Sequence, residues 1–242
     1  MQEKSIQKPL LSLRNICFAY DGIIALRHID LDVYAGETLI VQGDNGCGKT
    51  TLLKLLNGLL EAEEGSFTYA GKAVDGKALA DDSFNKWFHQ QVGFIWQDAD
   101  VQLFCATVEE EIAFGPSQMG LSQQECQKRV EEMLELFDIA KLRDRAPYHL
   151  SGGEKRKVAV ACILALNPEL LVLDEPLSGL DKKSQLWLEE LLQLLHEAGK
   201  TMIISTHNEK LAQSLGTRFV YINDRHELEP GAQPYPTPGK EV

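Results

Sequence analysis

The sequence lacks a hydrophobic run long enough to cross a membrane. Its longest uninterrupted apolar stretch, residues 158–166, has nine residues, whereas a membrane-spanning helix needs about 20. The first ten residues include Glu3, Lys4 and Lys8 and show no apolar segment of the kind found in a secretory signal. We therefore expect a chain that neither spans a bilayer by itself nor carries such a signal.

Clustered basic residues and cysteine pairs are also lacking. The chain has 24 Lys and Arg against 36 Asp and Glu, a formal net charge of −12. Binding to a nucleic-acid backbone needs clustered Lys and Arg, so we expect no nucleic-acid partner. The five cysteines are scattered without a C-x-x-C pair, which is typical of free thiols in a reducing cytosol. The histidines have no metal-ligand spacing, which argues against zinc.

Length and hydrophobic patterning predict one α/β domain with an insert. At roughly 150 residues per domain, 242 residues suffice for one large domain or a domain with an inserted subdomain. Residues 11–18 and 29–33 alternate as in strands of a partly exposed sheet. Capping-box patterns at Thr107, Ser122 and Ser151 indicate a helical insert. Apolar segments predict further strands at 37–42, 170–173, 201–205 and 218–222, and helices at 51–57 and 181–196.

A glycine-rich segment carries the strongest chemical signal. Residues 43–50 match G-x-x-x-x-G-K-[ST] in full and lie between a predicted strand and a predicted helix. Glycines let consecutive N–H groups face one phosphate, and the helix adds its positive N-terminal end. Lys49 can reach the β- and γ-phosphates, and the Thr50 hydroxyl can ligate Mg²⁺. The predicted nucleotide-binding residues of this loop are Gly43, Asp44, Asn45, Gly46, Cys47, Gly48, Lys49, Thr50 and Thr51.

Two adjacent carboxylates follow the apolar segment 170–173. In an open parallel sheet, ligands bind at this carboxyl end of the strands. Burying Asp174 is unfavourable unless a cation compensates its charge, so we expect it to serve Mg²⁺ directly or through another ligand. Glu175 points the other way and could polarise a water for attack on the γ-phosphate. Acids at strand ends are also often simply solvated.

Three further motifs have both a structural and a functional interpretation. Ser151, Gly152 and Gly153 form either a helix N-cap or a second anion site, and a second site suggests service to another subunit's nucleotide. His207 follows an apolar strand as Asp174 does, although a lone histidine is more often structural. The Tyr20 side chain could be core or a base-stacking platform.

With these residues assembled, the chain resembles the nucleotide-binding subunit of an ATP-binding-cassette (ABC) transporter over about residues 11–223. The resemblance implies a RecA-like parallel-sheet core with an N-terminal antiparallel β part and an α-helical subdomain inserted at about 98–166. These would form a single domain of residues 1–228, followed by a proline-rich irregular tail at 229–242. The motifs, in the family's order, are Tyr20, residues 43–50, Gln97, residues 150–154, Asp174 with Glu175, residues 178–181 and His207.

The resemblance also implies roles for individual residues and the cofactors ATP and Mg²⁺. Gln97 would ligate Mg²⁺ and sense a membrane partner, Glu175 would act as general base, and His207 would hold the γ-phosphate. Ser151 and Gly153 would contact the γ-phosphate bound by the opposite subunit. Asp181 would bridge the two subunits of a dimer, formed with a second copy or a paralogue, that encloses two ATP molecules.

A narrower resemblance lies in residues 92–104 and 107–116, which are similar to the energy-coupling-factor (ECF) importers, including the cobalt and nickel type. Asp98, Ala99 and Val101 depart from that group's pattern, whereas its second half is intact. The resemblance implies a peripheral ATPase at the cytoplasmic face of the membrane. Its partners would be a transmembrane coupling protein and a membrane protein that captures a vitamin or metal ion.

An alternative is a soluble ABC ATPase of iron–sulfur cluster assembly, which has a similar Ser-Gly-Gly-Glu signature. Residues 102–104 and 113–116 favour the importer. One more expectation concerns Cys47, which stands where the family usually has serine. Because it adjoins the phosphate loop, we expect it to react with maleimides, with loss of ATPase activity and protection by ATP.

Overall fold

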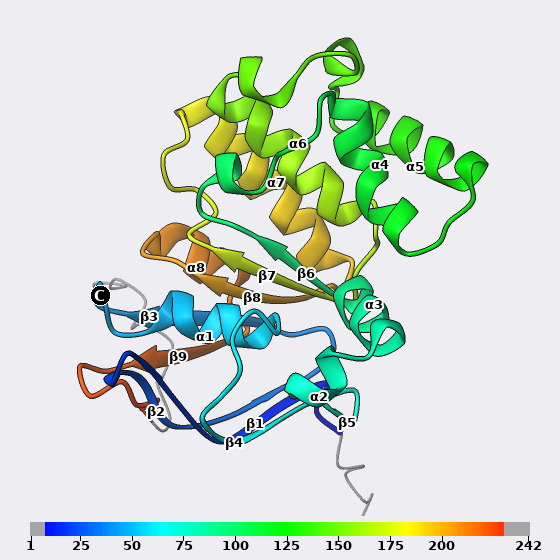
Figure 1. The fold of residues 1–242 in the computed structure, drawn as a ribbon. Coiled ribbons are helices and arrows are strands. Elements are labelled where there is room, and N and C mark those ends of the chain that lie inside the picture. The colour runs from blue at the N-terminus through cyan, green and yellow to red at the C-terminus, as the bar shows by residue number, and fades with distance from the viewer. Residues whose placement is uncertain (1–7, 230–242) are drawn as a thin grey trace, which may run out of the picture.

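The structure, a computed structural model, describes residues 8–229, which form two β-sheets and a cover of helices (Figure 1). Except for Glu229, the predicted tail at 229–242 lies outside the described residues. Within 8–229, no helix is both long and apolar enough to cross a membrane.

The central sheet is parallel, with the strand order β6-β7-β8-β3-β9. Successive side chains of a strand point to opposite faces, so Leu39 and Val41 enter one core cluster and Ile40 enters the other. Burial on both faces explains why these strands are continuous apolar runs in the sequence. The strands are β3 (Thr38–Gly43), β6 (Val92–Ile95), β7 (Leu170–Asp174), β8 (Thr201–Ser205) and β9 (Arg218–Ile222).

An antiparallel sheet with the order β2-β1-β4-β5 lies below the central sheet (Figure 1). Helix α1 (Lys49–Leu56) shares one core cluster with both sheets through residues such as Leu52 and Leu53. This arrangement confirms the predicted α/β class with an N-terminal antiparallel part. The strands are β1 (Leu11–Tyr20), β2 (Ile23–Val33), β4 (Glu64–Tyr69) and β5 (Lys72–Ala73).

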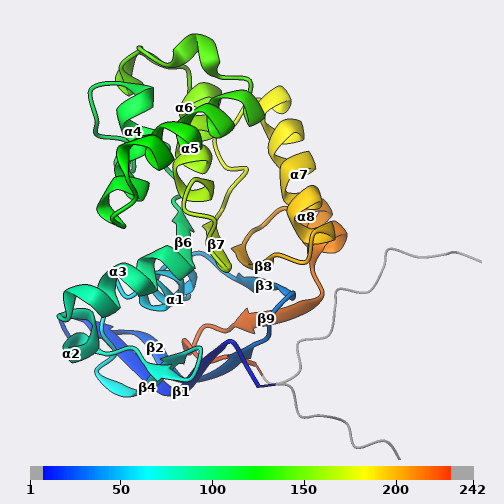
Figure 2. The same ribbon diagram turned by 90° about the vertical axis from the view of Figure 1, so that its right-hand side faces the viewer.

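Helices cover the other face of the central sheet (Figure 2). The predicted capping boxes are complete at Ser122 and Ser151, whereas the Thr107 side chain only accepts from the Glu110 amide. The predicted insert therefore is helical, and its standing as a subdomain remains a prediction. The helices here are α4 (Val108–Gln118), α5 (Gln123–Leu136), α6 (Gly152–Leu164) and α7 (Lys182–Glu197).

Several short elements were not predicted. Helix α3 (Asp82–Gln91) has only Phe88 buried and thus no strong periodicity, and β5 has two residues. The others among them are strands β4 and β6, helices α2 (Gly76–Leu79) and α8 (Glu209–Leu215), and the 3₁₀ turns η1 (Ala99–Val101), η2 (Ala140–Leu142) and η3 (Pro147–His149).

Candidate nucleotide site

The glycine-rich loop joins β3 to α1 at the carboxyl edge of the parallel sheet. Gly48 has φ of 117°, and a Cβ there would lie 2.3 Å from the Ala25 carbonyl oxygen, so only glycine fits. The Lys49 ammonium donates to the carbonyl oxygens of Gly43 at 2.7 Å and Asp44 at 2.9 Å. The loop thus curls around its own lysine, which is held close to the place where a phosphate would bind.

Asp174 ends β7 and is buried next to the loop. Its two carboxylate oxygens accept from the Thr50 hydroxyl at 2.8 Å and the Ser205 hydroxyl at 2.5 Å. These bonds come from α1 and β8, so three elements meet at one carboxylate. The structure therefore brings together the predicted Mg²⁺ residues Thr50 and Asp174.

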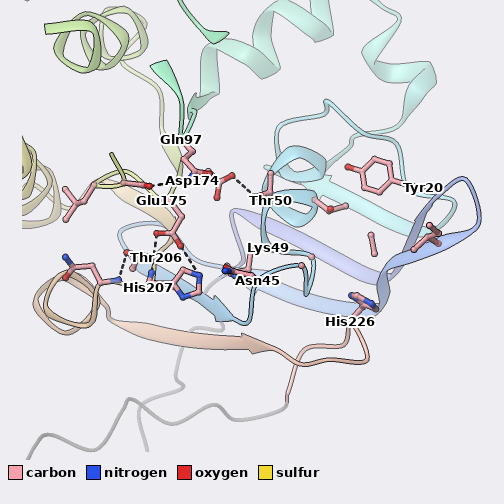
Figure 3. Close-up of a pocket in the computed structure, with 18 of the residues that line it drawn as sticks. Tyr20, Asn45, Lys49, Thr50, Gln97, Asp174, Glu175, Thr206, His207 and His226 are labelled. Carbon is pink, nitrogen blue, oxygen red and sulfur yellow. Dashed lines mark hydrogen bonds and ion pairs between the residues drawn. The ribbon is translucent and has the colours of Figure 1, made fainter. Parts of the chain in front are cut away.

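Glu175 and His207 face each other across the edge of the sheet (Figure 3). The His207 Nε2 lies 3.4 Å from Glu175 Oε1, and the His207 amide donates to Oε2 at 3.3 Å. Glu175 has φ of 42°, and its amide donates to the Ser205 carbonyl and hydroxyl oxygens. A positive φ is strained for a glutamate, and such strain often accompanies active sites.

The electrostatic surroundings of Glu175 raise its pKa. Burial is the largest cause, and the negative charge of Asp174 adds to it. The His207 amide and ring and the Lys49 ammonium act in the opposite direction. A carboxylate with a raised pKa is a stronger base than an exposed one, which suits proton abstraction from water.

One open cavity of 780 Å³ collects most of the predicted residues. Figure 3 shows Glu175, His207 and Gln97 at one end and Tyr20 at the other. The Gln97 amide donates to the Ser178 hydroxyl at 3.3 Å, and the Tyr20 ring packs edge-on against Phe18. The predicted residues that line this cavity are Tyr20, Asn45, Gly46, Gly48, Lys49, Thr50, Thr51, Gln97, Asp174, Glu175 and His207.

The remaining predicted residues lie elsewhere. Ser151, Gly153 and Asp181 line a separate cavity of 370 Å³. Both Ser151 and Asp181 act as N-caps, of α6 and α7 respectively. The structural interpretation of the serine–glycine motif therefore holds within one chain, and a role toward a second chain stays a prediction. Gly43, Asp44 and Cys47 do not line the larger cavity.

Cys47 corrects an expectation drawn from the sequence. Its side chain is buried at 4% exposure beneath the loop, and this burial raises the pKa of the thiol despite the nearby Lys49. Because the thiolate is the reactive species, the prediction of ready reaction with maleimide is wrong for this fold.

Sequence reasoning missed several residues of the larger cavity. His226 follows β9, and its Nδ1 donates to the Cys47 carbonyl oxygen at 2.9 Å. No local pattern could have placed it, because this contact joins residues 179 positions apart. Ser178 belongs to a motif that was noted but was not assigned to the site. The other missed residues are Ile23, Ile24, Ala25, Leu177, Gln185, Thr206 and Asn208.

Comparison with known proteins decides the family. The ABC transporter family pattern matches residues 26–178. This chain belongs to the ABC transporter family. It is 44% identical over 220 residues to "Nickel import ATP-binding protein LarO" of Lactiplantibacillus plantarum, with 91% of each chain covered. As a member of this ATP-binding family, it is an ATPase, and its resemblance to nickel and cobalt import ATPases is confirmed.

Solved structures agree with this assignment. The ABC ATPase is similar to cbiO1 of Clostridium perfringens, titled part of the ABC transporter complex cbiONQ, with a TM-score of 0.78, 30% identity and coverage of 92% and 88%. It is also similar to the dimeric ATP-binding cassette MJ0796 bound to ADP and Pi, with a TM-score of 0.79, 28% identity and coverage of 91% and 97%. The RecA-like core is therefore confirmed.

Proposed function

We propose that this ABC ATPase is the ATP-hydrolysing subunit of an ECF-type importer and works as a dimer around two ATP molecules. The observation that carries the dimer is the separation of two cavities in one chain. The phosphate loop lines one cavity, and Ser151 and Gly153 line the other. In a head-to-tail pair, each chain's Ser151 would meet its partner's nucleotide. The dimeric MJ0796 structure supports this arrangement.

The chemistry is hydrolysis of ATP to ADP and phosphate. Backbone amides of the loop and the Lys49 ammonium bind the phosphates, and Tyr20 stacks on the base. Glu175 accepts a proton from the attacking water as its oxygen bonds to the γ-phosphorus and the bond to ADP breaks. His207, next to Glu175, donates a hydrogen bond to the γ-phosphate.

Mg²⁺ fits the oxygen donors at the centre of the cavity. The Thr50 hydroxyl, the Gln97 amide oxygen and the Asp174 carboxylate are the hard ligands that this ion prefers. Thr50 and Asp174 already share a 2.8 Å hydrogen bond. We propose that Thr50 and Gln97 hold the ion and that Asp174 either ligates it or orients Thr50. When bound, Mg²⁺ would neutralise charge on the phosphates.

An exposed aromatic pair supports a membrane partner. Phe104 is 67% and Phe114 43% exposed, and their rings lie edge-to-face with centroids 4.9 Å apart. The amides of Phe104 and Cys105 donate to the buried Glu111 carboxylate. Both rings belong to the segments that resemble ECF ATPases. We propose that they contact a transmembrane coupling protein, so the ATPase acts as a peripheral subunit at the cytoplasmic face of the membrane.

The substrate class follows from the relatives. LarO is named a nickel import protein, and cbiO1 is titled part of an ABC transporter complex. We therefore propose uptake of a transition-metal ion or a vitamin, captured by a separate membrane protein.

Purification from detergent-solubilised membranes of the native host tests the membrane partner. Integral membrane proteins should co-purify with the wild-type chain and be lost with Phe104→Asp. Leu194→Asp on α7, at a position 63% exposed, is the matched control and should retain them. The isolated set of proteins should transport labelled metal ion or vitamin with ATP. An active wild-type chain free of membrane proteins would contradict the proposal and favour the soluble alternative.

A further inference from the structure

Arg156 lies in the first half of α6 and is almost fully buried, at 2% exposure. Its Nη1 donates to the Trp96 carbonyl oxygen and its Nη2 to the Gln97 carbonyl oxygen. Within the described chain its acceptors are carbonyl oxygens, not carboxylates. A buried guanidinium without an ion pair is costly, so packing alone does not account for an arginine here.

Two further contacts join the same segment to α6. The Lys155 ammonium pairs with Asp100, and the Gln102 amide donates to the Ala159 carbonyl oxygen at 2.8 Å. The segment 96–102 is thus held at Trp96 and Gln97, at Asp100 and at Gln102, always by one short stretch of α6. Of these contacts, the Arg156 guanidinium is the one that holds the backbone of Gln97 itself.

The position of Gln97 depends on this backbone. Its side chain lines the 780 Å³ cavity and donates to Ser178 at 3.3 Å, which is a long hydrogen bond. A weak side-chain contact by itself does not fix an amide. Residue 97 also follows the end of β6 at Ile95, so the sheet no longer holds it.

We propose that Arg156 is a positioning residue: it fixes the Gln97 backbone so that the Gln97 amide oxygen faces bound Mg·ATP. Because Arg156 lies on the helix that begins at Ser151, it also ties the position of Gln97 to that of the serine–glycine motif. This inference rests on the Mg²⁺ role proposed for Gln97.

The test compares ATP binding with Mg²⁺ and with EDTA, measured at equilibrium with a fluorescent ATP analogue. Arg156→Gln should raise Kd about fivefold or more with Mg²⁺ and leave Kd unchanged in EDTA, since only the ion-dependent part of binding needs Gln97. Arg156→Lys keeps the charge and one donor and should give a smaller change. Equal changes in both conditions would mean a general structural role and overturn the proposal.

Lys157→Gln is the matched control on the same helix. The Lys157 ammonium also donates to a backbone carbonyl, that of Phe137 at 3.0 Å, and lies over the Trp187 ring. It should leave the ratio of the two Kd values unchanged. If Arg156→Gln does not fold, as judged by thermal unfolding, Arg156→Lys supports the same comparison.

A double variant separates this inference from the role of Gln97. If Gln97→Ala weakens Mg²⁺-dependent binding and Arg156→Gln adds nothing to it, the two residues act together as proposed. If their effects add, Arg156 does not act through Gln97, and the inference fails while the Gln97 role stands. If Gln97→Ala has no effect, the Mg²⁺ role of Gln97 fails and the inference fails with it.

Discussion

Glu175 combines a strained backbone with a raised pKa, and both have the same origin. Its position after β7, at φ of 42°, places the carboxylate in a half-buried site between Asp174 and His207. Burial there disfavours the charged form, and the nearby Lys49 and His207 only partly compensate. The residue is therefore suited to the proposed general base, which must take up a proton during each turnover.

The raised pKa predicts an early loss of activity in acid. A general base works only when deprotonated, and Glu175 stays protonated to a higher pH than a glutamate with the ordinary pKa of 4.5. We expect kcat for ATP hydrolysis to fall on acidification with a midpoint above 4.5, in a pH range in which circular dichroism shows the chain still folded. A midpoint at or below 4.5 would contradict the proposed base.

Glu175→Gln completes this measurement. It should lower hydrolysis by about 100-fold or more and abolish the acid limb of the pH profile, while ATP binding persists and traps a stable dimer. Glu132→Gln, an exposed carboxylate on α5, is the control and should change neither. Hydrolysis near the wild-type rate would remove Glu175 from this role.

Cys47 leads to a second prediction at the residue scale. Since burial raises the pKa of its thiol, we expect maleimide to label Cys47 more slowly than the half-buried Cys17 in the native chain. Peptide mass spectrometry after timed labelling measures both rates, and unfolding in urea should make them similar. Fast labelling of Cys47 that ATP prevents would instead support the expectation drawn from sequence alone.

At the scale of elements, α5 and α6 begin with the same device. In each, the serine hydroxyl accepts from the glutamate amide, at 3.3 Å for Ser122 and 3.4 Å for Ser151. Each glutamate carboxylate accepts from the serine amide, at 2.8 Å for Glu125 and 2.9 Å for Glu154. The two caps should therefore contribute similar stability, and a difference in function between them cannot come from capping.

This pair gives a matched test. Ser122→Ala and Ser151→Ala should each lower the free energy of unfolding by about 1 kcal/mol, measured by urea denaturation. Only Ser151→Ala should also lower ATPase activity, by about tenfold, because it removes a hydrogen bond to the partner's phosphate. Equal activity of the two variants would leave Ser151 with a capping role alone.

The caps also show how far spacing predicts structure. The pattern at Thr107 is the same as at Ser122 and Ser151, yet the Glu110 carboxylate accepts from Ala106 instead of Thr107. Spacing cannot distinguish these outcomes, since the path of the chain before the helix decides which amide the carboxylate reaches. Similarly, α3 escaped prediction because its side chains Phe84 and Trp87 are only partly buried against the core.

At the scale of the whole molecule, the phosphate loop and the serine–glycine motif lie in separate cavities. A head-to-tail dimer would contain two composite sites, each with one chain's loop and the other chain's motif. Damage to different halves in two chains therefore leaves one composite site intact in a mixed dimer.

We expect such complementation between Lys49→Ala and Ser151→Asp. Each variant should be inactive alone: the first loses phosphate binding, and the second keeps a helix cap but repels the partner's phosphate. Mixing them in equal amounts should restore up to about a quarter of wild-type ATPase activity, measured by phosphate release. Two copies of one damaged variant at the same total concentration are the control. No recovery on mixing would argue against the composite site.

Local sequence determined the elements with strong signals: the loop before α1, the apolar strands β3, β7 and β8, and helix α7. Their signals are local because phosphate binding needs glycines at fixed spacing and buried parallel strands need unbroken apolar runs. The family assignment also came from the order of motifs along the chain.

Tertiary structure alone decided which of these residues meet. The order β6-β7-β8-β3-β9 brings the Thr50 hydroxyl to Asp174, 124 residues away. It also buries Cys47, adds His226 to the cavity and sets Arg156 against the Gln97 backbone. These contacts are long-range, so they follow from how strands and helices pack, and no pattern within a short window of sequence contains them.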